Sequence, residues 1–293
     1  MKILITGGTG FIGRALTGEL VQDGHEITIV SRKKRENKNK VSYIEWDSKS
    51  LLEAVSKSDF VINLAGEPVI GKRWTNKQKD LLRKSRIETT KLLVDAINHV
   101  SAKPRKLINA SAVGIYGNRK DENLNEDSKA GSDFLADLCR EWEECANKAD
   151  TKVVIIRIGI VLGKDGGALK MMVPPFKFFL GGQLGSGNQY MPWIALQDVI
   201  GLVKFAIEND NVSGILNTTS PNPVTNKEFS NILGKVLHRP SFIPVPAFAL
   251  KLLLGEMSDI LLGGQKVIPA NALKHEYKFK YAELEGALRK ILI

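Results

Sequence analysis

The chain has 293 residues, of which 43% are hydrophobic and 25% charged, a composition typical of a globular protein. That length suits one large α/β domain, or a nucleotide-binding domain with a smaller companion. No apolar stretch is long enough to span a bilayer and the first apolar run is too short for a signal peptide, so we expect a cytoplasmic protein without a membrane partner. Cys139 and Cys145 lie six positions apart in a helical pattern and the four histidines are scattered, so neither a disulfide nor a metal site is predicted.

Much of the net charge of +10 comes from one basic run, Arg32 to Lys40. Such a run is either a solvated loop or a basic rim that attracts the phosphates of a cofactor. No aromatic side chain interrupts the run to stack on bases, so nucleic-acid binding is not expected.

Strand and helix patterns alternate through the first two thirds of the chain, as a parallel sheet with crossover helices requires. Several strands are continuous apolar runs, typical of strands that are covered on both faces. The sequence therefore predicts an α/β protein with a doubly wound parallel Rossmann sheet. The predicted strands are Lys2–Thr6, Glu26–Ser31, Val41–Glu45, Phe60–Leu64, Lys106–Ala110, Val153–Ile158 and Gly214–Asn217. The predicted helices are Phe11–Gln22, Thr75–His99, Asp133–Ala149 and Leu196–Glu208.

Glycine and proline become frequent near Gly163, and a second proline-rich zone runs from Pro221 to Pro246. The α/β alternation returns between these zones, and a helical tail ends the chain. We therefore predict a nucleotide-binding Rossmann domain from residues 1–163 and 196–219. Residues 164–195 and 220–293 would form a smaller C-terminal substrate lobe, with the cofactor crevice between the two.

The first thirteen residues carry the clearest motif. An apolar strand stops at Gly7, and a helical pattern starts at once after Gly7-Gly8-Thr9-Gly10-Phe11-Ile12-Gly13. The first glycine allows a sharp turn, Gly10 allows backbone N–H groups to approach a pyrophosphate, and Gly13 lets the helix lie close on the sheet. Gly24 supplies a stop for this helix. Strand, glycines and helix in this order predict a dinucleotide site.

The end of the second strand selects between the two nicotinamide cofactors. An NAD-selective site places a carboxylate there to bind the ribose 2′-OH, whereas this chain has Ser31 and Arg32. Arg32 can make a charge-assisted contact with a 2′-phosphate, and Ser31 can donate a hydrogen bond. The alternative is that Arg32 only faces solvent. The sequence favours NADP(H).

Two further strand ends are candidates for cofactor contacts. Asp47 follows the third strand, where its carboxylate can accept from the adenine amino group. Asn63 ends the fourth strand, and the small residues in Leu64-Ala65-Gly66 permit backbone contact with the inner ribose. Ordinary strand-end chemistry is the alternative for both.

These residues resemble the extended short-chain dehydrogenase/reductase superfamily. The similarity lies in the glycine loop, in Asn63-Leu64-Ala65-Gly66 and in the segment from Ala110 to Gly117. Arg73-Trp74-Thr75, Ser85-Arg86-Ile87, Met191-Pro192-Trp193-Ile194 and the tail from His238 are similar to an atypical subgroup, the epimerase family proteins. The resemblance covers nearly the whole chain and implies an NAD-dependent epimerase/dehydratase-like fold with a small C-terminal domain.

In the superfamily a serine holds the substrate carbonyl, and a Tyr-x-x-x-Lys pair on a helix supplies the proton. Ser111 matches the serine. The resemblance implies that the tyrosine and lysine lie one turn apart on one face of a helix downstream of Ser111. In this chain Phe134 and Leu138 occupy the positions at that spacing. Tyr116 and Lys120 have the Tyr-x-x-x-Lys spacing, but they lie in a stretch that is predicted to be a loop, so their side chains need not share a helix face. Tyr116 alone, placed near the nicotinamide, is the remaining candidate for a catalytic residue. The alternative is that it is an aromatic side chain that only packs in the loop.

Other polar residues follow the strand ends. Glu67 is expected to face the crevice and to contact the cofactor, with a solvated loop acid as the alternative. Arg86 is a candidate for binding the cofactor side of the crevice or an anionic substrate, with a salt bridge between helices as the alternative. The helices Thr75–His99 and Asp133–Ala149 are candidates for a homodimer interface, as in many relatives.

Two functions remain open from the sequence. The first is an NADP(H)-dependent oxidoreductase or epimerase that acts on an unknown small molecule without the Tyr-x-x-x-Lys pair. The second is a non-catalytic NADP(H)-binding redox sensor or regulator. The intact Ser111 and the second lobe favour the enzyme, whereas the missing pair favours the sensor.

Overall fold

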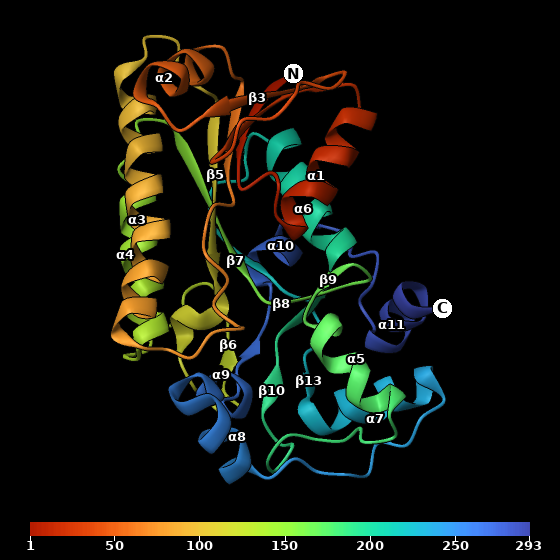
Figure 1. Ribbon diagram of the computed structural model, residues 1–293. Coiled ribbons are helices and arrows are strands. Elements are labelled where there is room, and N and C mark those ends of the chain that lie inside the picture. Colours follow the sequence, from red (N-terminus) through yellow and green to blue (C-terminus); the bar gives the residue numbers. More distant parts are fainter.

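The computed structural model describes residues 1–293, and a seven-stranded parallel sheet runs through its centre (Figure 1). The strand order β12-β7-β5-β4-β1-β2-β3 confirms the predicted doubly wound sheet. All seven predicted strands are present, with ends that shift by one or two residues. They are β1 (Lys2–Thr6), β2 (Glu26–Ser31), β3 (Val41–Glu45), β4 (Phe60–Asn63), β5 (Lys106–Ala112), β7 (Lys152–Ile158) and β12 (Gly214–Thr218).

Helices cover both faces of the sheet, as continuous apolar strands require (Figure 1). Ile3 and Ile5 of β1 face one helical layer, and Leu4 faces the other. The first layer consists of α1 (Phe11–Gln22) and α6 (Leu196–Glu208). The second consists of α2 (Ser48–Ser56), α3 (Asn76–His99) and α4 (Phe134–Ala146).

The helix ends follow local capping chemistry. Asp133 Oδ1 accepts from the amide of Ala136 at 2.9 Å and caps α4. Thr75 caps α3 by accepting from the amide of Gln78 at 3.2 Å, but the Gln78 side chain does not bond back, so only half of a capping box forms. The sequence analysis missed α2, a short helix that Asp47 caps.

The chain reverses its direction of strand addition between β1 and β4. It moves from β1 to β2 and β3 on one side, and then continues through β4, β5, β7 and β12 on the other. The carboxyl ends of β1 and β4 are therefore adjacent, and the loops that follow them diverge. In open α/β sheets such a switch point forms the crevice in which ligands bind.

Smaller elements form the rest of the molecule around a second core that includes Trp193, Phe229 and Leu288. The short strands are β6 (Asn123–Leu124), β8 (Ile160–Gly163), β9 (Gly166–Gly167), β10 (Tyr190–Met191), β11 (Trp193–Ala195), β13 (Val224–Thr225) and β14 (Lys266–Val267). The helices are η1 (Val113–Tyr116), α5 (Leu169–Lys177), α7 (Asn226–Leu237), α8 (Ala247–Leu254), η2 (Gly255–Met257), α9 (Ser258–Leu262), α10 (Ala270–Lys274) and α11 (Leu284–Leu292).

Part of the C-terminal segment returns to the central sheet. β14 pairs with β6, and Asn271 donates to the backbone carbonyl of Ile215 in β12 at 2.9 Å. Asp198 of α6 is buried and accepts from the amides of Lys280 and Tyr281 at 2.7 and 3.0 Å. The last forty residues therefore tie the smaller elements to the Rossmann sheet.

We predict opposite effects for alanine at two glycines of α1. A Cβ on Gly13 would lie 2.2 Å from the carbonyl oxygen of Gly7, whereas Gly18 is exposed and has nothing within 4 Å of its Cβ position. Gly13→Ala should lower the free energy of unfolding by about 2–3 kcal/mol because the turn must shift. Gly18→Ala should raise it by about 0.5–1 kcal/mol through helix propensity. Urea unfolding measures both, and an equal change in the two variants would contradict the packing argument.

Candidate cofactor site

The turn after β1 is packed too tightly for side chains at two of its glycines. Gly7 has a φ of +69°, and a Cβ there would lie 2.5 Å from the carbonyl oxygen of Leu64, just after β4. Gly13 meets the Gly7 carbonyl in the same way. These contacts hold the first turn of α1 against the carboxyl ends of β1 and β4, the arrangement that a phosphate-binding glycine loop requires.

The amino end of α1 presents unpaired donors. The backbone amides of Phe11, Ile12 and Gly13 donate no hydrogen bond within the protein, and the helical bonds begin with Arg14 and the carbonyl of Gly10. Free N–H groups and the positive end of the helix dipole both favour an anion at this position. The residues present therefore fit the pyrophosphate of a dinucleotide.

Phe11 also connects this loop to the smaller elements. Its ring lies so close to β8 and β9 that a Cβ on Gly163, Gly166 or Gly167 would lie 2.4–2.9 Å from a ring carbon. The sequence pattern showed only that glycine becomes frequent here, and did not indicate this contact. Thr9 contributes its backbone carbonyl, which accepts from the Arg14 guanidinium at 3.0 Å.

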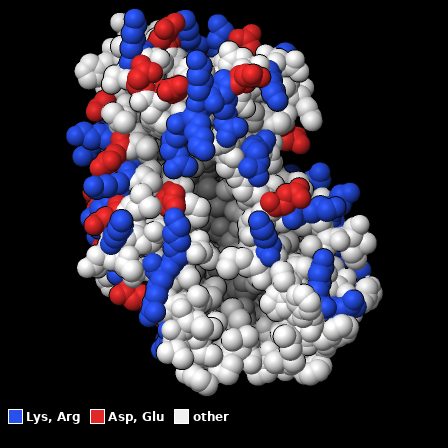
Figure 2. Space-filling model, viewed as in Figure 1, with Lys and Arg blue, Asp and Glu red and all other residues white.

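The structure leaves Arg32 free of an ion pair. Arg32 follows the carboxyl end of β2, is exposed, and has no carboxylate within salt-bridge distance, whereas Ser31 is buried and accepts from the amide of Lys33 at 3.3 Å. Figure 2 shows lysine and arginine side chains gathered above a central hollow in the molecule. Arg32 is thus available to an external anion.

Asp47 already has a structural task. Its Oδ1 accepts from the amide of Ser50 at 2.8 Å and caps α2, and this hydrogen bonding lowers the pKa of the Asp47 carboxyl. The cap explains the carboxylate at this position without a cofactor. Contact of Asp47 with an adenine stays a prediction.

The end of β4 is held by a buried amide. Asn63 Oδ1 accepts from the Thr6 hydroxyl at 2.5 Å, and its Nδ2 donates to Asn109 Oδ1 at 2.6 Å. Asn63 therefore ties β4 to β1 and β5 instead of reaching outward. The backbone of Leu64, Ala65 and Gly66 continues past this tie, beside the glycine loop.

Glu67 and Arg86 lie together beyond the end of β4. Arg86 of α3 is buried, donates to the backbone carbonyls of Leu82 and Glu67 at 3.1 and 3.0 Å, and stacks over the Trp142 ring. No carboxylate pairs with its guanidinium, and burial lowers its pKa. The Glu67 carboxylate is partly exposed and lies 3.2 Å from Lys72. The alternative of a salt bridge between helices is therefore not realised at Arg86.

Ser111 points into the interior. The residue is buried, and its hydroxyl donates to Glu143 Oε1 at 2.6 Å. Glu143 of α4 also accepts two bonds from the Arg157 guanidinium, at 2.9 and 2.8 Å. Burial acts to lower the pKa of Arg157, but the bonds and charge of Glu143 outweigh it and raise that pKa. The Ser111 hydroxyl is thus committed to a buried ion pair.

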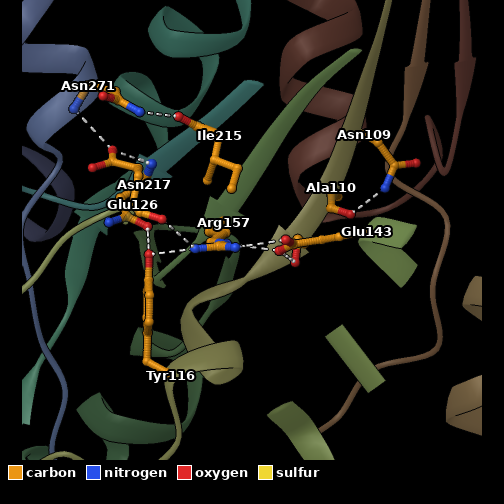
Figure 3. A network of polar contacts seen from close by, with 10 residues as sticks. Asn109, Ala110, Tyr116, Glu126, Glu143, Arg157, Ile215, Asn217 and Asn271 are labelled. Carbon is orange, nitrogen blue, oxygen red and sulfur yellow. Dashed lines mark hydrogen bonds and ion pairs between the residues drawn. The ribbon is translucent and has the colours of Figure 1, made fainter. Parts of the chain in front are cut away.

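Tyr116 belongs to the same network (Figure 3). Its side chain is fully buried in η1, and its hydroxyl donates to Asn217 Oδ1 at 2.7 Å and accepts from Arg157 at 2.9 Å. Burial raises the pKa of the Tyr116 hydroxyl. The Tyr116 hydroxyl is therefore engaged by Asn217 and Arg157 in this structure, and a catalytic role for it stays a prediction.

Sequence reasoning missed the charged members of this network. Arg157 stands in the otherwise apolar strand β7, and Glu143 lies on the buried face of α4. Glu126 extends the network, because its Oε1 accepts from the amides of Asn217 and Asn271 at 2.9 and 3.2 Å. An arginine inside a continuous apolar strand was the available signal, since a charge there needs a buried partner.

The helix expected to carry the proton donor offers none. α4 contains neither tyrosine nor lysine. Phe134 packs edge-on against Trp74, and Leu138 is buried. Burial raises the pKa of the neighbouring Cys139 to about 11, so this thiol stays protonated at neutral pH.

The geometry defines a dinucleotide-binding Rossmann protein with an additional C-terminal part. Residues 3–218 match the model of the NAD dependent epimerase/dehydratase family, and residues 245–291 match a domain of unknown function. The chain belongs to the NAD dependent epimerase/dehydratase family.

Similar proteins span the whole chain. An epimerase family protein SDR39U1 homolog, chloroplastic, from Arabidopsis thaliana is 44% identical and is covered over 87% of its length, with 100% of this chain. Epimerase family protein YfhF from Bacillus subtilis is 40% identical, over 98% of its length and 100% of this chain. A crystal structure of human epimerase family protein SDR39U1 with NADPH has a TM-score of 0.93 at 38% identity, over 99% of each chain. The predicted subgroup is confirmed. None of the helices combines the length and apolar character needed to cross a bilayer.

The buried ion pair makes a stability prediction. Arg157→Met would leave the Glu143 carboxylate buried without its partner, and should lower the free energy of unfolding by about 3–5 kcal/mol. The double variant Arg157→Met with Glu143→Leu should recover most of this loss, because no charge remains buried. Denaturant unfolding measures both, and a single variant as stable as the parent would show that the pair is not isolated from water.

Proposed function

We propose that this chain binds NADP(H) across the carboxyl ends of β1, β2 and β4 and uses it on a small molecule, as an oxidoreductase or epimerase. The free amides at the start of α1, next to Gly10 and the Gly7 turn, would hold the pyrophosphate. Ser31 and Arg32 would hold the 2′-phosphate. The observation that favours NADP(H) over NAD(H) is that Arg32 is exposed and has no ion-pair partner. The 38% identical human protein that was crystallised with NADPH supports this proposal.

The substrate would enter the hollow between two parts of the chain (Figure 2). We keep the division into a Rossmann domain, residues 1–163 and 196–219, and a smaller lobe, residues 164–195 and 220–293. The backbone of Leu64, Ala65 and Gly66 would line the inner ribose. α3 and α4 pack side by side and remain the proposed homodimer surface, and a cytoplasmic location stays a prediction.

The proton chemistry would use residues other than the expected pair. Bound NADPH supplies a hydride, and the protein then needs only to orient the substrate and move a proton. Ser111 and Tyr116 are enclosed, so we assign the proton to Glu67, whose partly exposed carboxylate lies beyond the end of β4. Arg86 lies behind the backbone of Glu67 and would add positive charge next to an anionic substrate or cofactor group.

One observation favours the second function, a non-catalytic NADP(H)-binding sensor. Both hydroxyls that the superfamily pattern offers, Ser111 and Tyr116, are committed to buried hydrogen bonds. A sensor needs no proton relay. If the protein is a sensor, the buried hydrogen bonds of Ser111 and Tyr116 serve only to stabilise the fold. Turnover separates the two functions.

We predict that Arg32→Ala weakens NADPH binding by about tenfold to a hundredfold, since a charge-assisted bond to the 2′-phosphate is lost. NADH binding should change little, because NADH lacks that phosphate. Fluorescence titration with both cofactors measures the difference. Lys38→Ala, in the same basic run, is the matched control. Equal losses for both cofactors in Arg32→Ala would refute the assignment.

We predict that Glu67→Gln abolishes turnover while the Kd for NADPH stays within about twofold, because the amide keeps the size and hydrogen-bonding capacity of the carboxylate but cannot exchange a proton. NADPH oxidation would be followed with nucleotide sugars, quinones and carbonyl compounds. Ser111→Ala is the comparison: it should reduce stability, by about 1–3 kcal/mol, and leave turnover intact. Tight NADPH binding without turnover on any compound would establish the sensor instead.

A further inference from the structure

One end of the molecule exposes large apolar side chains. Phe178, Phe242, Phe248 and Leu252 are 74–77% exposed, and Phe179 and Leu180 are more than half exposed. We call these six residues the apolar face. Isolated exposed apolar residues are ordinary, but a cluster of aromatic and leucine side chains on a soluble surface marks a contact site.

The six residues come from two segments that lie side by side. The amide of Ile243 donates to the carbonyl of Gly181 at 3.2 Å, and the amide of Val245 donates to that of Gln183 at 2.8 Å. The first segment carries Phe178 to Leu180 directly after α5, and the second carries Phe242 and leads into α8. Figure 1 shows α5 on the right and α8 on the lower left of the molecule, with the loop that leads into α8 running along the lower edge between them.

The charges next to the apolar face are mostly positive. Glu256, directly after α8, is ion-paired with Lys79, and Asp259 lies on α9. No aspartate or glutamate occurs in residues 166–197 or 229–255, the two stretches that contain the face. Lys177, Arg239 and Lys251 lie in these stretches, are exposed and form no ion pair, and the Arg239 guanidinium stacks 4.8 Å above the Phe179 ring. In Figure 2 the lowest part of the molecule is white, with blue side chains above it on both sides and a small red group at the left margin.

A second copy of the chain is a poor occupant for this surface. A symmetric contact would bring the same cations of two copies together, with no carboxylate in either stretch to compensate them. An anionic bilayer surface fits instead, because aromatic and leucine side chains enter the headgroup boundary while lysine and arginine contact the lipid phosphates. This binding needs no helix that crosses the membrane.

We propose that the apolar face docks the protein onto the surface of an anionic lipid membrane. The contact is peripheral, with α8 and the end of α5 lying in the interface. The inference stands apart from the proposed function, since none of the six residues contributes to the cofactor site.

The test is co-sedimentation of the full chain with vesicles at physiological ionic strength. The protein should pellet with vesicles that contain phosphatidylglycerol, and much less with vesicles of phosphatidylcholine alone. Phe248→Asp and Leu252→Asp should each weaken binding about tenfold or more, because each removes apolar area that would be buried in the membrane interface. Lys251→Glu should weaken it on the order of tenfold through charge.

Leu52→Asp is the matched control, because Leu52 is an exposed leucine on α2, outside the face. It should bind vesicles like the parent. Circular dichroism and thermal unfolding would confirm that each variant is folded. The proposal fails if the parent does not bind anionic vesicles, or if the face variants bind as well as Leu52→Asp does. It also fails if light scattering shows a dimer that the same variants dissociate, since the face would then join two copies.

Discussion

The contact between the Gly7 turn, the Gly13 backbone and the end of β4 sets how closely α1 approaches the sheet. With a Cβ at Gly7 or Gly13, the helix would move away from the carboxyl ends of β1 and β4. Its free amides would then no longer point across the switch point, and the Phe11 ring would leave the glycines of β8 and β9. The cofactor loop, the sheet and the smaller elements are therefore positioned by one dense contact, because interiors packed at this density transmit displacements of a few tenths of an ångström.

The second organising feature is the buried polar network around Arg157. It joins β5, β7, β12, α4, η1 and the loop after β6 through hydrogen bonds to charged groups, which are stronger than neutral ones. A hydroxyl inside such a network is stabilised but unavailable to a ligand. This fold therefore keeps a serine and a tyrosine near the positions of the superfamily pattern while engaging both in buried hydrogen bonds.

The molecule is polarised along its long dimension. The basic run after β2 and the free amides of α1 follow the carboxyl ends of the sheet strands, whereas the apolar face lies on the loops after α5 and α7 and on α8. Figure 2 shows basic side chains above the hollow and a white surface below it. The two ends suit different contacts: one attracts phosphates through charge, and the other would remove apolar side chains from water.

Local patterns in the sequence determined the sheet strands, the main helices, the glycine loop and the polarity of the β2 end, because each depends on neighbours within a few residues. Capping by Asp133 and the Gly24 stop are of this kind. Only the tertiary structure decided where Ser111, Tyr116 and Arg86 point. Their partners lie far away in the chain: Ser111 meets Glu143, and Tyr116 meets Arg157 and Asn217. Which hydroxyl faces a crevice and which is enclosed follows from how distant elements pack, and no local spacing encodes that.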